Sequence, residues 1–393
     1  MTRRALAALV ALGVVSLAGC GPDSEDADPP RARSTPSAHA SEGDQHAAPA
    51  AHKLKPLRAG EKRLTMTMSA PYTPSAPTGV GTDDYRCFLL DPGLSRDAFI
   101  TGTNVLPGNP EVVHHVILFR VPAGDVRRAE ALDDETPGDG WTCFGNSGIS
   151  AAGNELDSAP WLGAWAPGGR ETVFRNGLGV PLEKGSRIVM QVHYNLLAGD
   201  SPDVSATQLR LAPASAGLAR VETMLMPTPV ELPCRPGHDA SPLCDRATAL
   251  ADVKARFGDG PGSTADLLHF LCGPVRAGEV QTCDRTILEP TTIVGVAGHM
   301  HLLGRSIQIE VNPDTPRART ILDLEVWDFD NQGAKPIKPI VLQPSDTVRV
   351  TCRHVQWLRD RLPAFEGQPD RYVVWGEGTT DEMCLGILQV VRG

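Results

Sequence analysis

Short stretches in which apolar and polar residues alternate recur along most of the chain, and Pro-rich and Gly-rich turns separate them. An alternation with a period of two, together with β-branched residues, is typical of strands that bury one face. The pattern predicts turns at residues 107–110 and 166–169, and strands at residues 64–68, 113–121, 187–196, 306–311 and 347–352. Many short strands without long helices between them predict an all-β protein built from sandwiches or barrels.

Only residues 95–99 and 247–257 have patterns that favour helix, and neither stretch changes this class. With 393 residues, the chain is longer than a typical single domain, so we expect two. A strand-like segment at 208–211 meets a run of small residues at 212–217, which marks a plausible boundary. We therefore predict one folded domain at residues 61–213 and a second at 214–393.

The first nineteen residues have the features of a secretory signal. Arg3 and Arg4 precede an apolar run at residues 5–16 that is too short to remain in a bilayer. Small residues then lead to Cys20, a pattern typical of bacterial lipoprotein signals, so we expect Cys20 to be the lipidated first residue of the mature protein. An ordinary secretory signal, in which this cysteine has no role, is the alternative.

Residues 20–60 contain almost no large apolar side chain, so they cannot bury enough surface to fold and are predicted to be a disordered tether. We interpret the histidines at 39, 46 and 52 as solvated linker residues, with weak copper capture as the alternative. The expected location is extracytoplasmic, with the lipid anchor holding a monomer to a bacterial membrane. A formal charge of -10 without a basic cluster argues against nucleic acid or anionic headgroups as partners.

Eight cysteines lie downstream of Cys20, and an even number in an exported chain favours disulfides. For four of them, all in the second predicted domain, spacing leaves three pairings open: Cys234, Cys244, Cys272 and Cys283. A four-thiolate zinc site there is a weaker alternative, because no Cys-x-x-Cys pair occurs. The eight are Cys87, Cys143, Cys234, Cys244, Cys272, Cys283, Cys352 and Cys384.

Side chains that bind metals occur in three separated places: at His114 and His115 together with His193, at His299 and His301, and at Met383. Imidazoles suit copper, zinc or iron, whereas a thioether is a good ligand for Cu(I) and a poor one for hard cations. The mixture therefore favours copper with a redox role. A His-x-His pair is also common in structural contexts, and a lone methionine is usually core filler.

The strand pattern bears on how these ligands meet. His299 and His301 are two residues apart, so on a strand they project to one face and Met300 projects to the other. His114 and His115 are neighbours and would point to opposite faces. They can share a metal only if the backbone is irregular there, or if one binds through Nδ1 and the other through Nε2. Gln191 shares a face with His193 and is expected near the same metal.

Four motifs in this order resemble the copper type II ascorbate-dependent monooxygenases, the family of peptidylglycine alpha-hydroxylating monooxygenase and dopamine beta-monooxygenase. The resemblance extends from about Leu64 to the C-terminus. Its motifs are Val112-Val-His114-His115-Val-Ile-Leu-Phe119, Gln191-Val-His193-Tyr194, His299-Met-His301-Leu-Leu-Gly304 and Thr379-Thr-Asp-Glu-Met383-Cys384.

The resemblance implies two antiparallel eight-stranded jelly rolls, each holding one copper, with a solvent-filled cleft between them. It implies that O2 binds and the substrate C–H bond breaks at the copper of His299, His301 and Met383. The copper of His114, His115 and His193 would store and deliver the second electron, drawn from ascorbate or another one-electron donor. It also implies disulfides between Cys87 and Cys143 and between Cys352 and Cys384. His238, His269 and His354 match no ligand and are interpreted as structural or surface residues.

The expected function is hydroxylation of a small organic substrate with O2. Two alternatives are a copper-binding or electron-transfer protein without catalysis, and a zinc hydrolase that uses the three-histidine site. In the amidating members of the family, three positions bind the carboxylate of a glycine-ending peptide, and here they are Ala297, Leu385 and Ile387. None can donate a side-chain hydrogen bond, so an apolar or neutral substrate is expected, although Arg305 could supply an anchor from another direction.

Overall fold

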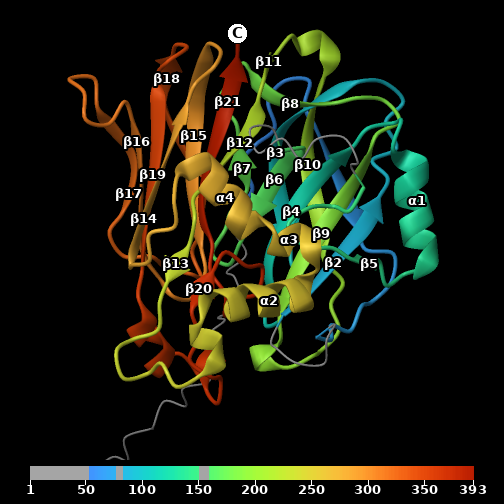
Figure 1. Cartoon of the computed structure of the whole chain (residues 1–393). Coiled ribbons are helices and arrows are strands. Elements are labelled where there is room, and N and C mark those ends of the chain that lie inside the picture. The colour runs from blue at the N-terminus through green and yellow to red at the C-terminus, as the bar shows by residue number, and fades with distance from the viewer. Residues whose placement is uncertain (1–52, 77–82, 150–158) are drawn as a thin grey trace, which may run out of the picture. The chain divides into compact units, whose positions relative to one another are not determined.

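The computed structural model describes residues 53–76, 83–149 and 159–393. The signal, Cys20 and nearly all of the predicted tether lie outside these residues. The described chain is all-β, as predicted, and its strands form five sheets within one compact unit (Figure 1). No helix among the described residues is both long and apolar enough to cross a bilayer.

Two sheets in the first half face each other across one core. The first has the order β1-β10-β3-β8-β11, with β7 also paired to β3, and the second has the order β5-β2-β9-β4-β6. The bounds are β1 (Lys62–Thr67), β2 (Asp83–Leu90), β3 (Ala98–Leu106), β4 (Val113–Val121), β5 (Trp141–Thr142), β6 (Trp161–Trp165), β7 (Thr172–Val173), β8 (Leu178–Leu182), β9 (Arg187–Asn195), β10 (Ala206–Pro213) and β11 (Ala219–Arg220).

Side chains from both sheets are fully buried in this core, for example Leu118 from β4, Met190 from β9 and Leu209 from β10. Each such side chain contributes about 1.5–3 kcal/mol by leaving water. The opposite face of β4 and β9 is also covered, because Phe119 and Val189 pack in a smaller cluster with Ala129 of helix α1 (Val126–Glu135). The strands that carry the first histidines are therefore held from both sides.

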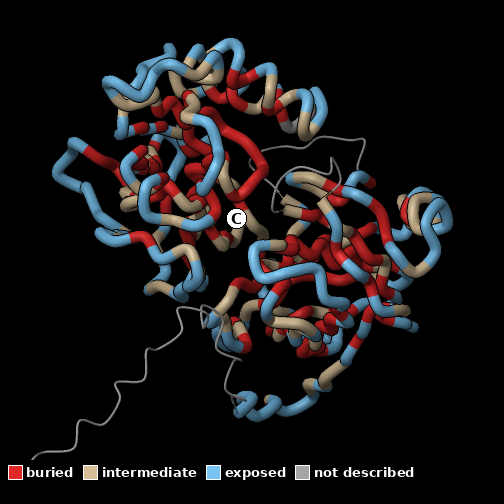
Figure 2. Tube along the Cα trace, turned by 90° about the horizontal axis from the view of Figure 1, so that it is seen from below, coloured by how far each residue is buried: buried red, intermediate tan, exposed pale blue. Residues whose placement is uncertain are grey.

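The second half repeats this arrangement with two four-stranded sheets, β12-β21-β15-β18 and β14-β19-β16-β17, and a two-stranded sheet, β13-β20. Buried residues from both four-stranded sheets form one core. Figure 2 shows the buried residues (red) concentrated in the interior of the described chain and the exposed ones (pale blue) on its periphery. The bounds are β12 (Glu222–Pro227), β13 (Glu231–Leu232), β14 (Val280–Thr286), β15 (Thr291–Met300), β16 (Gly304–Val311), β17 (Arg319–Leu324), β18 (Lys335–Leu342), β19 (Thr347–His354), β20 (Val373–Val374) and β21 (Cys384–Arg392).

The expected helix at residues 247–257 is present as α2 (Arg246–Phe257), where Asp245 accepts a hydrogen bond from the Thr248 amide at the N-terminus. The expected helix at 95–99 is wrong. Phe99 lies in β3 and pairs with Ala212 and Pro181 on either side, so sheet hydrogen bonds override the local preference. Three helices were not expected: α1, α3 (Asp259–Gly262) and α4 (Thr264–Cys272).

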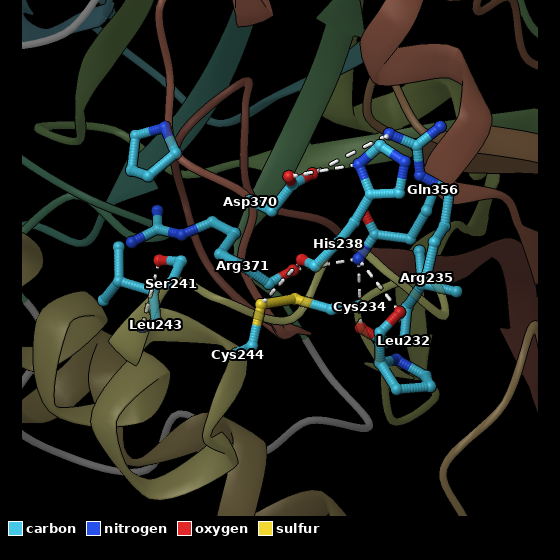
Figure 3. Close-up of a disulfide and its surroundings, with 12 residues drawn as sticks. Leu232, Cys234, Arg235, His238, Ser241, Leu243, Cys244, Gln356, Asp370 and Arg371 are labelled. Carbon is cyan, nitrogen blue, oxygen red and sulfur yellow. Dashed lines mark hydrogen bonds and ion pairs between the residues drawn. A yellow bond between two sulfur atoms is a disulfide. The ribbon is translucent and has the colours of Figure 1, made fainter.

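Four disulfides join the eight cysteines. Cys87–Cys143 and Cys352–Cys384 are confirmed, and the second of these links the two four-stranded sheets directly beside Met383. The pairs left open by the sequence are Cys234–Cys244, shown in Figure 3, and Cys272–Cys283. The four-thiolate zinc alternative is therefore wrong. Four disulfides indicate that the chain folds in an oxidising compartment.

We predict that Cys352→Ser lowers the free energy of unfolding by about 2–5 kcal/mol, because the bridge is fully buried and closes a loop of 32 residues. Cys234→Ser is the matched control. Its bridge closes only 10 residues, so the chain-entropy model gives a loss smaller by about 1 kcal/mol. Urea unfolding without reductant measures both. Equal urea midpoints for Cys352→Ser and the wild type would contradict a stabilising role for the Cys352–Cys384 bridge.

Candidate metal centre

A bulge in β4 brings the two adjacent histidines to the same side. Val113 pairs with Tyr194 of β9 and His115 pairs with His193, so the register shifts and His114 is the extra residue. The Nδ1 atoms of His114 and His115 lie 3.4 Å apart, although neighbours on a regular strand point to opposite faces. The irregular backbone, one of the two routes considered from the sequence, is therefore present.

The third nitrogen comes from the neighbouring strand. Nδ1 of His193 lies 3.1 Å from Nδ1 of His115, and one ring nitrogen from each of the three histidines falls within 4.8 Å of the others. Metal–nitrogen bonds of about 2.0–2.1 Å at tetrahedral angles place ligand nitrogens roughly 3.3 Å apart. The two separations from His115, 3.4 and 3.1 Å, are close to this value, so the three side chains are placed to share one metal ion.

Burial lowers the pKa of three of the five histidines in the two ligand sets. Burial, and then the neighbouring His193 and His114, lower the pKa of His115 well below its ordinary value. Burial likewise lowers the pKa of His299, and it lowers that of His301 to about 3. Neutral imidazoles keep a lone pair free at pH 7, which is the form that binds metals.

Asp83 orients His193 from the other side of the ring. Its Oδ1 lies 2.7 Å from Nε2 of His193, so Nε2–H donates and the lone pair of Nδ1 faces the other two histidines. Burial alone would raise the pKa of Asp83, but the hydrogen bonds and charge of His193 and the hydrogen bonds from Thr379 lower it. The ring of Tyr85 stacks on His193 with centroids 4.1 Å apart.

The second set of ligands lies where β15 ends and β21 begins. His299 pairs with Leu385 and Met300 with Cys384, so the ends of the two strands adjoin, and Met383 immediately precedes β21. The rings of His299 and His301 have centroids 5.1 Å apart. Met300 is fully buried in the core of the second half, as the strand alternation predicted.

Each histidine of this set keeps one nitrogen for a metal. Nδ1–H of His299 donates to Oε1 of Gln332 over 2.6 Å, which leaves the lone pair of Nε2. Nδ1 of His301 is buried and has no hydrogen-bond partner within the described chain. A buried polar atom without a partner is costly unless a ligand such as a metal ion binds it. A metal ion at His301 fits this observation.

Glu382 fixes both segments that carry these ligands. Its carboxylate accepts hydrogen bonds from the backbone N–H groups of His301, Leu303 and Met383, at 3.0, 2.5 and 3.1 Å. His354, interpreted as structural from the sequence, lies against Glu382 at 3.3 Å and donates to the Met383 carbonyl at 3.1 Å. Burial would raise the pKa of Glu382, but His354 and then His301 lower it.

A cavity of about 390 Å³ joins the two sets. His115 from the first set and His299, His301 and Met383 from the second set line it, and the rings of His115 and His299 have centroids 5.9 Å apart. The two ligand sets therefore meet around one space, a closer arrangement than the solvent-filled cleft implied by the resemblance. Most of the remaining wall is apolar, including Leu162, Val296, Ala297, Leu385 and Ile387.

The remaining residues considered in the sequence analysis differ in whether they reach the cavity. Gln191 lines the cavity and donates to the Asn146 carbonyl at 3.2 Å. Arg305 is not among the described residues of the lining, and its guanidinium donates to the Glu325 carbonyl instead. His238 is half exposed beside Asp370, and His269 binds Glu231 at 2.6 Å.

Asp83, Tyr85 and Glu377 were not predicted from the sequence. Asp83 and Tyr85 lie shortly before Cys87, in a stretch from which only the cysteine was singled out. Glu377 lies six residues before Met383, inside a segment that drew attention only for its methionine. Nothing in the local sequence pattern marks these side chains as buried or partly buried, so only the structure identifies them.

No protein-family model matches the chain, and no curated protein matches it. Similar solved structures include a Paenibacillus xanthan lyase, at 10% identity over 85% of this chain and 25% of that one, with a TM-score of 0.19. Allantoicase is 14% identical over 75% and 78% of the two chains, with a TM-score of 0.16.

A fucolectin from striped bass (Morone saxatilis) serum is 9% identical over 85% of this chain and 97% of that one, with a TM-score of 0.16. This chain spans about a quarter of the xanthan lyase. Likenesses this weak carry no argument about fold or function, so the site is interpreted from its own geometry.

We predict that Asp83→Asn weakens metal binding at the three-histidine site by about ten- to a hundred-fold, because the amide cannot hold the His193 tautomer as a carboxylate does. Asparagine retains an oxygen that can accept from Thr379, so the fold should persist. Copper titration against a competing chelator gives the affinity. Asp200→Asn, at an exposed position, is the control and should match the wild type. Unchanged affinity in folded Asp83→Asn would exclude the orienting role.

Proposed function

We propose that this protein is an exported copper-dependent monooxygenase that hydroxylates a C–H bond of a small organic substrate. One observation carries the proposal: a set of three histidines and a set of two histidines and a methionine line or adjoin one largely apolar cavity. The resemblance to the copper type II ascorbate-dependent monooxygenases supports it, and ascorbate or a similar one-electron donor is the proposed reductant.

The ligand chemistry favours copper at both sites. Imidazole nitrogens suit Cu(I) and Cu(II), and the Met383 thioether favours Cu(I) at the second site. Insertion of one oxygen atom from O2 into a C–H bond releases water and consumes two electrons and two protons. When bound, two copper ions would supply the O2 chemistry and the two one-electron steps that this balance requires.

The residues of the chain have distinct parts in this proposal. Asp83 and Glu382 hold the ligands, and the apolar wall excludes bulk water and packs against the hydrocarbon part of the substrate. The short separation of His115 and His299 suits electron transfer between the two sites. The cavity is the feature that favours catalysis over the alternative of a copper-binding or electron-transfer protein, which needs no space for a substrate.

A zinc hydrolase is less consistent with the site, because it would leave Met383 and the second pair of histidines without a role. We further propose that lipidation of Cys20 anchors the protein at the outer side of a bacterial membrane. The four disulfides fit this location.

We predict that the wild-type protein binds about two coppers per chain and that His193→Ala and His299→Ala each bind about one, as expected for separate sites. Both variants should also lose ascorbate-dependent O2 consumption, since the reaction needs both sites. His238→Ala, a half-exposed histidine away from the cavity, should retain both copper ions and the activity. Loss of both coppers from either folded variant would contradict two independent sites.

A peptide ending in glycine should not be a substrate. Ala297, Leu385 and Ile387 line the cavity and none can donate a side-chain hydrogen bond, so a peptide carboxylate would lose its hydration without compensation there. An acylated glycine incubated with copper and ascorbate should give no saturable conversion to the amide. Efficient amidation would show that another group in the cavity binds the carboxylate.

A further inference from the structure

Glu377 is the only acidic or basic residue, histidines aside, among the described residues that line the cavity. The lining contains no lysine, arginine or aspartate in the described part of the chain. Its other polar groups are hydroxyls, amides and imidazoles. A single carboxyl group in an apolar wall therefore dominates the electrostatics that the protein itself presents to a substrate.

The backbone around Glu377 is fixed. The Tyr85 hydroxyl donates to the Glu377 carbonyl at 2.6 Å, and the Gly376 amide donates to the Glu382 carbonyl at 3.0 Å. Gly145, with φ of +66°, approaches the carboxyl closely, and a methyl group at its Cα would come within 3.1 Å of Oε1. The backbone of Glu377 is thus held at the cavity wall, and its carboxyl group lies beside Gly145.

Glu377 as a whole residue is only 5% exposed, yet no described residue donates a hydrogen bond to its carboxyl group or forms an ion pair with it. Other buried acids in the protein are paired: Glu231 binds Arg246, and Asp381 binds Arg256 through both oxygens. Burial, with a smaller contribution from Asp381, raises the pKa of Glu377 to about 7. A carboxyl group that faces a cavity without a partner from the protein is free to accept hydrogen bonds from a ligand there.

We propose that Glu377 is a specificity-determining residue that binds the ammonium group of a small apolar amine in this cavity. The ammonium group supplies the hydrogen-bond donors and the positive charge that the wall lacks. Leu162, Val296 and Ile387 contact the hydrocarbon part, and the volume suits a small molecule. This replaces the expectation of a neutral substrate with a more specific one and leaves the exclusion of carboxylates intact.

The inference rests on the proposed monooxygenase for the reaction, but binding can be tested without turnover. The test uses the copper-free protein and three probes of equal chain length: n-hexylamine, hexan-1-ol and hexanoate. Isothermal titration measures each dissociation constant. We expect hexylamine to bind about ten- to a hundred-fold more tightly than hexanol, and hexanoate to bind more weakly than either.

Glu377→Gln keeps the size of the side chain and removes the charge, so the preference for hexylamine over hexanol should disappear. Glu377→Asp keeps the charge and should retain part of the preference. Glu366→Gln, at an exposed acid, controls for a change in net charge and should behave as the wild type does. Because Glu377→Gln removes an unpaired buried acid, its melting temperature should equal or exceed that of the wild type.

Equal affinities for hexylamine and hexanol in the wild type, or an unchanged preference in Glu377→Gln, would overturn the proposal. Loss of a copper equivalent in Glu377→Gln would also overturn it, since the carboxyl group would then serve the metal. A preference for hexylamine without any ascorbate-dependent O2 consumption would leave the specificity intact and contradict the monooxygenase. Hydroxylation of neutral molecules without a preference for the amine would support the monooxygenase and overturn the role of Glu377 in specificity.

Discussion

The carboxylate of Glu382 holds together the two segments on which the second ligand set depends. A fully buried carboxylate must be compensated, and here three backbone N–H groups and His354 do so. These N–H groups belong to the turn after β15, which carries His301, and to the residue Met383 itself. The same contacts that satisfy the buried charge therefore set the separation of His301 and Met383. The adjacent Cys352–Cys384 bridge fixes the start of β21 to the facing sheet.

The loop before Glu382 extends this constraint to the first ligand set. Thr379 donates to Asp83 through its amide at 3.0 Å and through its hydroxyl, and Asp83 orients His193. Tyr85, which stacks on His193, donates to the carbonyl of Glu377 in the same loop. One short segment therefore contacts the surroundings of both sites. A change in the position of this loop would disturb the ligands of both sets, although the two sets come from different sheets.

Much of the fold and most of the proposed ligands could be predicted from local patterns. Strand alternation located β4, β9, β16 and β19 to within a few residues, because each buries at least one regular face. It could not reveal the bulge at His114, which arises from the pairing of β4 with β9 and has no glycine to mark it. Residues 95–99 were misassigned for a similar reason, since pairing with β8 and β10 decides their conformation. Asp83 and Thr379 lie 296 residues apart, and no periodicity connects them.

The electrostatics of the cavity depend on the same distant contacts. Burial lowers the pKa of His115, His299 and His301. Asp381 pairs with Arg256 and Arg371, and Asp83 and Glu382 bind ligand-bearing segments. Each of these acids has a hydrogen-bond or ion-pair partner within the described chain. Glu377 alone faces the cavity without one among the described residues, because Tyr85 engages its backbone and Gly145 leaves room for its carboxyl group. The contacts that aim the histidines thus also determine that the protein presents one acidic group to whatever enters between them.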